Sequence, residues 1–258
     1  MNVSAEGLRV LVTAGAAGIG RAFASTFAGA GAKVFVCDVD AAALSEFRAA
    51  HPQIGATVAD VAVPAQVAAM FDATVRYLGG LDVLINNAGI SGPTAKVEDI
   101  SIADWERTIA VDLNSMFYCT RLAVPLIKAA GGGSIINLSS IAGRLGYPLR
   151  TPYSSAKWAV VGFTKSLAIE LGPSNIRVNA IQPGVVEGER VDRVISAKAK
   201  ALDLSVEAFR ERFVSTISLR RMISAQEIAD MALFLATPAG RSISGQALSV
   251  CGDHGMIA

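Results

Sequence analysis

The chain has 258 residues, with 23 basic and 22 acidic side chains, so its formal net charge is +1. A charge this balanced gives no long-range attraction toward nucleic acid or an anionic membrane, and we expect neither as a partner. Hydrophobic residues make up 52% of the chain, and no internal repeat is present. These features favour a single α/β domain over residues 1–258, with its core layered between a sheet and helices.

The cysteines and the N-terminal segment both indicate a cytoplasmic protein. Cys37, Cys119 and Cys251 are far apart and form no CxxC pair, which suits a reducing compartment better than a disulfide framework. Glu6 stands where a secretory signal would need an apolar run. The sequence also lacks a stretch of about 18 apolar residues, which a membrane-spanning helix would require.

Apolar runs rich in Val and Ile recur along the chain, with Ala-rich helical segments between them. The runs cover residues 8–13, 33–38, 56–60, 82–86, 134–139, 176–182 and 247–250. Most are too uniformly apolar for strands with one exposed face, so they predict a parallel sheet buried on both sides. Together with helical segments such as 64–77 and 105–129, they predict a doubly wound sheet. Ligands bind to such sheets beyond the carboxyl ends of the strands.

One segment, at about residues 184–218, breaks this alternation because it becomes highly charged while keeping helical spacing at Val191, Val194 and Ile195. We expect an inserted pair of short helices there, with Ser205 as the N-cap of the second. An insertion after a strand's carboxyl end is placed to close over a ligand. The alternative is a solvated helical hairpin with no special role.

The first predicted strand is followed by a turn of small residues, 13–20, that opens a helix. Small residues let the backbone approach a pyrophosphate, and the helix N-terminus offers free N–H groups and a positive dipole. Such turns also occur only to pack a helix on a strand. Asp38, which closes the second strand, can accept hydrogen bonds from a ribose diol, and neighbouring Val39 offers no charge for a 2′-phosphate. The pattern therefore predicts NAD rather than NADP.

Two further strand ends carry polar residues. Asp60 is expected to end the third strand, and the segment 86–89 (Asn-Asn-Ala-Gly) ends the fourth. That segment can bond neighbouring backbone groups and leave a flat surface for the adenosine half of a dinucleotide. An ordinary Asx turn is the alternative.

The residues with catalytic potential follow the fifth predicted strand, which Ser140 finishes. Thr151 is expected to cap a helix and Pro152 to occupy its first position, so Tyr153 falls in the first turn and Lys157 one turn later on the same face. A helix N-terminus and an ammonium both favour a phenolate, which suits Tyr153 to general acid–base work. Ser140 could then hold the substrate oxygen. A Tyr–Lys pair in isolation would more often be a helix surface contact.

Together these motifs resemble the classical short-chain dehydrogenase/reductase family, from Val10 to Val250. The resemblance implies a seven-stranded, Rossmann-like α/β/α fold, a tyrosine acid–base, a lysine that also binds the nicotinamide ribose, and a substrate lid after the Pro-Gly turn. It also implies homotetramers or homodimers built through helices at about 102–129 and 152–171. The expected NAD-binding residues are Gly15, Gly18, Ile19, Gly20, Asp38, Asp60, Val61, Asn87, Ala88, Gly89, Tyr153, Lys157, Pro183, Gly184 and Val186.

Two positions depart from the family pattern. Ala14 stands where the first glycine of the turn is usual, although Gly15 follows directly. Asp112 stands where such families place an asparagine that completes a proton relay, through a water, next to the lysine. An aspartate can accept the same hydrogen bond, but its charge would also weaken the pull of Lys157 on Tyr153. We hypothesise that Asp112 fills the relay role.

Other polar and aromatic residues have less certain roles. Arg144, Tyr147 and Arg150 lead into the catalytic helix, and they either reach the substrate or make surface or subunit contacts; Arg190 at the lid edge is equally ambiguous. Residues for which we expect no catalytic or metal-binding role are His51, His254, Trp105, Trp158, Cys37 and Cys119. The two histidines lack a second ligand at metal spacing, so no metal site is predicted. The tryptophans fit core or interface packing.

The sequence therefore predicts an NAD-dependent oxidoreductase that moves a hydride between a secondary alcohol and its ketone. One alternative is an NADPH-dependent ketoacyl reductase on the same scaffold, which Asp38 opposes. Another is a non-catalytic dinucleotide sensor, which should have lost Tyr153 or Lys157, and this chain keeps both.

Overall fold

Seven parallel strands form one sheet in the computed structural model, which describes residues 3–255. Their order across the sheet is β3-β2-β1-β4-β5-β6-β7. The strands are β1 (Arg9–Thr13), β2 (Lys33–Asp38), β3 (Gly55–Val58), β4 (Val83–Asn86), β5 (Gly133–Leu138), β6 (Ile176–Pro183) and β7 (Ala247–Val250). This is the predicted doubly wound arrangement, with the order reversing between β1 and β4.

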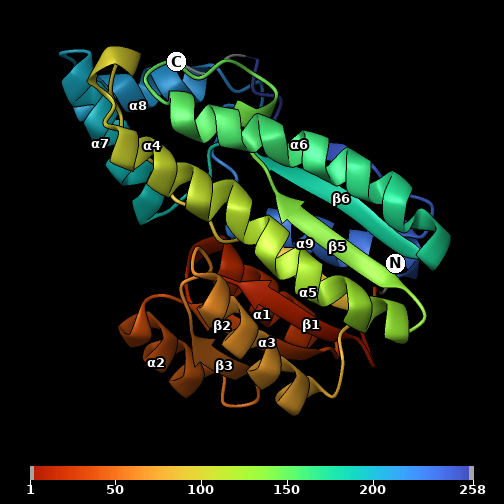
Figure 1. The fold of residues 1–258 in the computed structure, drawn as a ribbon. Helices are drawn as coiled ribbons and strands as arrows, with labels where there is room; N and C mark the ends of the chain where they lie inside the picture. Colours follow the sequence, from red (N-terminus) through yellow and green to blue (C-terminus); the bar gives the residue numbers. More distant parts are fainter. Residues whose placement is uncertain (1–2, 256–258) are drawn as a thin grey trace.

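Helices cover both faces of the sheet. One layer consists of α1 (Gly18–Gly29), α2 (Ala41–Ala50) and α9 (Ala225–Ala236). The other contains α3 (Pro64–Leu78), α5 (Ser115–Ala129) and α6 (Thr151–Leu171). Figure 1 shows α5 and α6 on the near side of β5 and β6, with α9 behind them. None of the helices between residues 3 and 255 is long and apolar enough to span a membrane.

The two helical layers enclose two separate cores, and alternate strand residues contribute to each. Val10 and Val12 of β1 pack into the core beneath α1 and α9, whereas Leu11 between them packs into the core beneath α3 and α5. Successive side chains of a strand point to opposite faces, so a strand covered on both faces must be apolar throughout. This is the physical origin of the uniformly apolar runs in the sequence.

The long helix predicted up to residue 129 is interrupted at its middle. It comprises α4 (Ile102–Ile109), a π-helical turn (Ala110–Asn114) and α5. The π turn holds an extra residue per turn, which changes the faces presented on either side of it. Asp112 lies within that turn and is completely buried.

The charged insertion forms two helices, α7 (Glu189–Ala201) and α8 (Val206–Ser215). The Ser205 hydroxyl accepts a hydrogen bond from Ala208 N at 3.1 Å and caps α8 as predicted. Buried residues of both helices form a third core with the loop that follows β5. Its members include Ile141, Ala142, Ile195, Ala199, Phe209 and Phe213.

Several predicted boundaries need correction. β3 ends at Val58, so Asp60 lies in the loop beyond it, and β5 ends at Leu138, so Ser140 follows the strand instead of finishing it. Helix α6 begins at Thr151, because Ser154 N already closes the first turn on Arg150 O at 2.9 Å. Thr151 is therefore not the N-cap, and its buried Oγ1 has no hydrogen-bond partner among the described residues.

Candidate active site

The glycine-rich turn after β1 packs too closely for side chains at two of its positions. A Cβ added at Gly15 would lie 2.6 Å from Val36 Cβ, and one at Gly20 would lie 2.7 Å from Asn87 Nδ2. Ala14 adopts the left-handed conformation, with φ of 51°, that a glycine would adopt more readily. The backbone therefore keeps its tight turn with an alanine at that position, at a cost of about 1–2 kcal/mol.

The end of β4 supports this turn directly. Thr13 Oγ1 accepts hydrogen bonds from the backbone N–H groups of Asn87 at 2.9 Å and Ala88 at 3.0 Å. The Asn87 amide in return donates to Thr13 O at 2.9 Å and Ala14 O at 3.0 Å. The Asn-Ala-Gly segment thus fixes the shape of the neighbouring glycine-rich turn. Thr13 was not among the predicted site residues, although it stands at the carboxyl end of β1, where ligand-binding residues are expected.

Asp38 lies at the end of β2, beside the same turn. Its carboxylate accepts hydrogen bonds from Ala16 N and from Asp40 N, each at 3.1 Å. Val39 is 63% exposed, and Asp40 caps α2 through the backbone N–H groups of its first turn. The end of β2 therefore presents two carboxylates and an apolar side chain beside the glycine-rich turn.

Asp60 and Val61 lie beyond the end of β3. The Asp60 carboxylate accepts a hydrogen bond from Ala62 N at 2.9 Å and forms an ion pair with Arg107 of α4 at 3.1 Å. Val61 is buried in the core beneath α3. The ion pair connects the loop after β3 to α4.

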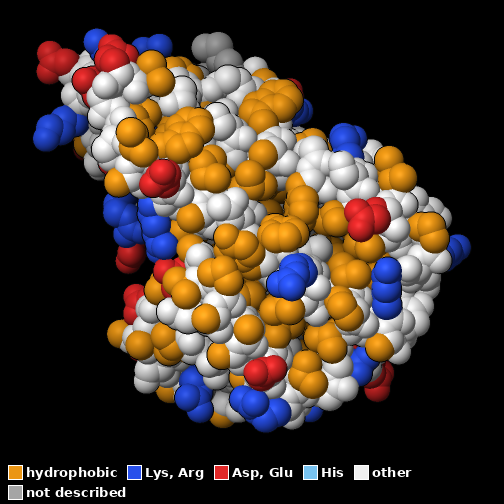
Figure 2. All heavy atoms as spheres, viewed as in Figure 1, with side chains coloured by type: hydrophobic (Ala, Val, Ile, Leu, Met, Phe, Trp, Pro, Cys, Tyr) orange, Lys and Arg blue, Asp and Glu red, His pale blue; other side chains and the backbone are white. Residues whose placement is uncertain are grey.

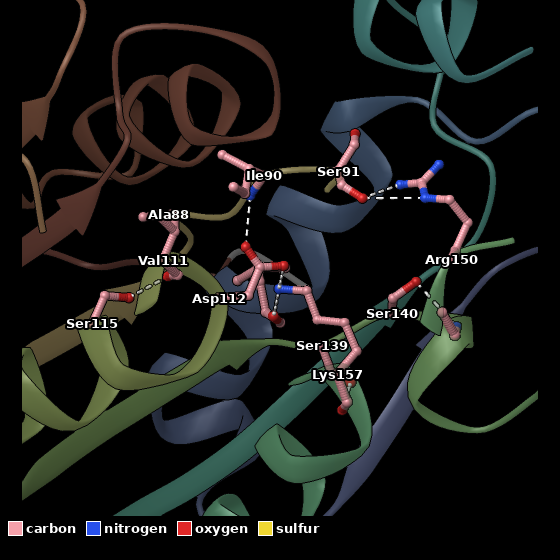
Figure 3. Close-up of polar contacts among 12 residues, drawn as sticks. Ala88, Ile90, Ser91, Val111, Asp112, Ser115, Ser139, Ser140, Arg150 and Lys157 are labelled. Atoms are coloured by element: carbon pink, nitrogen blue, oxygen red, sulfur yellow. Dashed lines mark hydrogen bonds and ion pairs between the residues drawn. The ribbon is translucent and has the colours of Figure 1, made fainter. Parts of the chain in front are cut away.

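The central feature of the site is the buried ammonium of Lys157, on α6. Its Nζ donates to Leu138 O at 3.1 Å, lies 3.5 Å from Asp112 Oδ2, and lies 5.5 Å from the centre of the Tyr153 ring. Figure 3 shows the Asp112 and Lys157 side chains pointing toward one another. The family resemblance implied a contact through a water between Lys157 and the residue at position 112; the structure shows a direct ion pair instead.

The two carboxylate oxygens of Asp112 have different contacts. Its Oδ1 accepts a hydrogen bond from Ile90 N at 2.7 Å, while Oδ2, the oxygen nearer Lys157, has no hydrogen-bond partner among the described residues. Gly89 lies against the pair, and a Cβ there would lie 3.2 Å from Lys157 Nζ. The π turn, the β4 loop and α6 therefore meet at one pair of charges.

The two serines after β5 take different roles. Ser139 Oγ donates to Lys157 O at 2.8 Å, so it anchors α6 to the sheet. Ser140 Oγ accepts a hydrogen bond from Ala142 N at 3.1 Å, and the residue is only 9% exposed. Ser154 Oγ donates to Ala142 O at 2.8 Å and ties this loop to the first turn of α6, next to Tyr153.

A buried polar chain that the sequence analysis missed fixes α6 against the strands. Asn86 Nδ2 donates to Asn137 Oδ1 at 2.8 Å, and Asn137 Nδ2 donates to Thr164 Oγ1 at 3.0 Å. These bonds cross from β4 to β5 and from β5 to α6. They hold the helix that carries Tyr153 and Lys157 in a defined register.

The Pro-Gly turn lies at the end of β6, against β7. Gly184 N donates to Val250 O at 2.9 Å, and a Cβ at Gly184 would lie 2.7 Å from Cys251 Cα. Val186 forms an isolated parallel bridge with Ile223. The turn is thus fixed between the end of β7 and the loop before α9.

The loop before α6 is largely interior. Arg150 is 2% exposed, and its Nε and Nη2 both donate to Ser91 O, as Figure 3 shows. Arg144 Nη2 donates to the backbone oxygen of the buried His254 at 3.2 Å. A surface role for Arg150 is therefore wrong, because its guanidinium is enclosed beside the site. The side chain of Arg190 lies outside the described side chains.

The cysteines and tryptophans named in the sequence analysis lie away from the catalytic residues' polar contacts. Cys37 and Cys119 are fully buried in the core, and burial raises the pKa of both thiols, that of Cys37 to about 12. Trp105 and Trp158 are 41% and 51% exposed, so a place in the core is wrong for them. Within residues 3–255, no group of three or more His, Cys, Asp or Glu is arranged to hold a metal ion.

Comparisons with known proteins define the class. A family model described as enoyl-(acyl carrier protein) reductase matches residues 14–256. A putative ketoacyl reductase of granaticin polyketide synthase from Streptomyces violaceoruber is 38% identical, covering 95% of this chain and 92% of the relative. The trans-4-hydroxycyclohexanecarboxylate dehydrogenase of Sinomonas cyclohexanicum is 39% identical, covering 95% of this chain and 91% of the relative.

Comparison with solved structures supports the same class of protein. A 7α-hydroxysteroid dehydrogenase in complex with NADH and 7-oxo glycochenodeoxycholic acid is 32% identical, with a TM-score of 0.89, over 98% of this chain and 96% of the other. An NAD+-bound xylitol dehydrogenase is 27% identical, with a TM-score of 0.92, over 98% of this chain and all of the other. The chain belongs to the short-chain dehydrogenase/reductase family, and it is an oxidoreductase of the class that acts on CH–OH groups. The sequence-based predictions of fold, family and enzyme class are confirmed.

The contacts of Thr13 give a first testable expectation. Thr13→Val keeps the side-chain shape but removes the oxygen that accepts two backbone N–H bonds, and each donor left unsatisfied costs about 1–3 kcal/mol. We expect the dissociation constant for NADH, measured by fluorescence titration, to rise about tenfold or more. Thr74→Val is the matched control, because buried Thr74 only donates to a carbonyl of its own helix. Unchanged NADH affinity in Thr13→Val would contradict this bracing role.

Proposed function

We propose that this protein is an NAD-dependent dehydrogenase/reductase that interconverts a secondary alcohol and its ketone, with Tyr153 as the residue that transfers the proton. The observation that carries the proposal is the placement of Lys157. It is a buried ammonium beside the Tyr153 ring and paired with Asp112, at the sheet edge where the glycine-rich turn also lies.

NAD fits the residues of the turn and its surroundings. Two structural neighbours bind NADH or NAD+, and Asp38, Val39 and Asp40 here provide two negative charges and no cation. Gly15, Gly18, Ile19 and Gly20 would hold the pyrophosphate, and Asp38 the adenosine ribose. The adenine and nicotinamide ends would contact the remaining predicted residues, Asp60, Val61, Asn87, Ala88, Gly89, Pro183, Gly184 and Val186. When bound, NAD supplies the acceptor or donor of the hydride.

The chain's own residues handle the proton. In alcohol oxidation Tyr153 Oη accepts the hydroxyl proton, and in ketone reduction it returns that proton to the oxygen. Ser140 Oγ lies beyond β5 and holds the same oxygen in place. Lys157 favours the negative charge on Tyr153 electrostatically and also binds the nicotinamide ribose. Asp112 acts through Lys157, as a positioning residue.

A ketoacyl reductase activity is the second candidate, because two relatives at 38–39% identity are named putative ketoacyl reductases. This alternative would use NADPH, and the carboxylate of Asp38 opposes binding of its 2′-phosphate. Other relatives are named hydroxysteroid and hydroxybutyrate dehydrogenases. The named substrates differ widely, so the substrate of this chain depends on its own pocket and on α7 and α8, which we propose as its lid.

We also propose a cytoplasmic homotetramer or homodimer that assembles through α4, α5 and α6. The three cysteines are free and buried, which suits a reducing compartment. Large apolar side chains on these helices are exposed, and Figure 2 shows apolar side chains across the face that the helices form. The exposed members are Ile102, Trp105, Phe117, Trp158 and Ile169. An exposed apolar surface of this kind is typical of a subunit interface.

The proposed function is tested with a panel of secondary alcohols, each assayed with NAD and with NADP. We expect turnover with NAD, and in Tyr153→Phe a fall in kcat of about 10²–10⁴-fold with NADH binding largely retained. Phe keeps the ring but lacks the oxygen that carries the proton. Undiminished turnover in Tyr153→Phe would overturn the mechanism, and a preference for NADP would overturn the role of Asp38. Turnover of acyl thioesters with NADPH alone would favour the second candidate.

The role of Asp112 is tested by two substitutions. Asp112→Asn keeps an oxygen for Ile90 N but removes the charge beside Lys157, so the ammonium attracts the phenolate more strongly. We expect the acid limb of the kcat/KM profile for alcohol oxidation to move to lower pH. Asp112→Leu removes the acceptor as well and should lower kcat about tenfold or more, since it leaves a buried charge without its partner. An unchanged rate and pH profile in Asp112→Asn would refute the relay and positioning role.

The interface proposal is tested by the mass of the particle in solution. Phe117→Glu places a charge on an apolar surface that is 52% exposed in the isolated chain, and we expect light scattering to show dissociation into smaller species. Val58→Glu is the control, because Val58 is similarly exposed, at 54%, on the edge strand β3. An unchanged mass for Phe117→Glu would exclude α5 from the interface.

A further inference from the structure

The segment that follows β7 lies along the end of the second inserted helix, α8. Residues 252–255 run antiparallel to residues 216–219, which leave α8, and Ile217 and His254 form an antiparallel bridge. Three backbone hydrogen bonds join the two segments: Ser218 N to Asp253 O at 3.0 Å, Leu219 N to Gly252 O at 3.1 Å, and Gly255 N to Thr216 O at 3.4 Å. We call residues 252–255 the clip. It connects the last strand of the sheet to the inserted helices.

A sharp turn after Cys251 places the clip against this segment. Gly252 and Asp253 both adopt the left-handed conformation, with φ of 65° and 59°. A Cβ at Gly252 would lie 2.9 Å from Ile217 Cγ2, so the close approach of the two segments also requires a glycine. Aspartate enters the left-handed region more readily than most residues, and Asp253 Oδ2 accepts a hydrogen bond from Ser218 Oγ at 2.6 Å. Contacts with the segment after α8 therefore offset the less favourable backbone conformation.

His254 is the buried centre of the clip. It is completely buried, its Nε2 lies 2.7 Å from Thr216 Oγ1, and its ring meets the Phe213 ring of α8 edge to face at 5.7 Å. Because the Thr216 hydroxyl donates its single proton to Phe213 O at 2.7 Å, the imidazole N–H is the donor to Thr216 Oγ1. The backbone oxygen of His254 accepts a hydrogen bond from Arg144 Nη2 at 3.2 Å, in the loop after Ser140. One residue thus contacts both α8 and the loop that carries the serine.

The residues just before the clip hold the other end of the insertion. Gly184 N donates to Val250 O at 2.9 Å, and a Cβ at Gly184 would lie 2.7 Å from Cys251 Cα. Residues 250–255 therefore contact the insertion where it leaves β6 and again where α8 ends. Between these two anchors, α7 and α8 share a buried core with Ile141 and Ala142. The position of the inserted helices is consequently set by a segment that contains none of the proposed catalytic residues.

We propose that the clip positions α8 for substrate binding, with His254 and Arg144 as its positioning residues. This inference rests on the proposed function, since it states what holds the lid of that site. Loosening the clip lets α8 move away from the loop after Ser140. Substrate binding is then weaker, but Tyr153 and Lys157 stay in place on α6. A rise in KM with kcat retained is the signature of such lost binding.

The first measurement compares KM and kcat for an alcohol that the wild type oxidises with NAD. We expect His254→Ala to raise KM about tenfold or more, because it removes the donor to Thr216 and the ring that packs on Phe213. The value of kcat and its pH profile should stay close to those of the wild type. His254→Gln keeps an N–H donor and should restore most of the wild-type KM. His51→Ala is the matched control, because His51 also contacts a phenylalanine ring, that of Phe47, at the end of a helix.

The second measurement does not need turnover. Hydrogen exchange of the backbone amides is followed by mass spectrometry in the peptide that covers α8. We expect exchange there to accelerate about tenfold or more in His254→Ala and in Arg144→Met, with exchange in α9 unchanged. Arg144→Lys keeps a donor for the backbone oxygen of His254 and should retain the wild-type exchange rate. The Arg144 side chain is exposed, so Arg144→Met supplies both measurements if His254→Ala does not fold.

Each outcome decides the proposal. An unchanged KM in His254→Ala, unchanged exchange of α8 in both variants, or a uniform acceleration across α8 and α9 overturns the positioning role. A loss of kcat without a rise in KM also overturns it, because the substitution would then act on the chemistry and not on the lid. Failure of the proposed function is read separately, as the absence of Tyr153-dependent oxidation of any alcohol in the panel with NAD. The exchange result for α8 still tests the clip in that case.

Discussion

The ion pair between Lys157 and Asp112 is the interaction on which the site depends. A lysine ammonium that is 3% exposed must have a nearby counter-charge, because an isolated buried ion is strongly destabilising. The partners come from the π turn and from α6, and Leu138 O at the end of β5 accepts the remaining described bond at 3.1 Å. The pair therefore forms only when both helices are packed on the sheet. Formation of the fold and formation of the site are consequently one event.

The need to place a counter-charge beside the buried Lys157 explains several local features that would otherwise be unfavourable. Gly89 has no side chain because a Cβ would crowd the lysine Nζ at 3.2 Å. The π turn interrupts a long helix, but it brings Asp112 inward to the bond with Ile90 N. The buried chain through Asn137 fixes α6 to the strands, because its two hydrogen bonds join β4, β5 and α6. Each feature restricts where Lys157 can lie.

The sequence was sufficient for features that depend on local patterns. Strands covered on both faces are uniformly apolar, and Tyr153 and Lys157 share a helix face through their spacing alone. Boundaries were less accurate: Pro152 fits either of the first two helical positions, so the start of α6 was placed one residue late. Contacts between distant segments were not predictable. Two examples are the direct Asp112–Lys157 pair and the burial of Lys198, which is 1% exposed within a charged run that resembles a solvated helix. Both depend on how the elements pack.

Two cations lie beside the Tyr153 ring, and the fold holds each of them in place. Lys157 lies 5.5 Å from the ring centre and is balanced by Asp112, a permanent part of the fold. Arg150, whose Cζ lies 5.3 Å from the centre of the same ring, is oriented by its hydrogen bonds to Ser91 O. Both cations favour negative charge on the phenol oxygen. The electrostatic surroundings of Tyr153 are therefore set by groups that the fold itself holds in place.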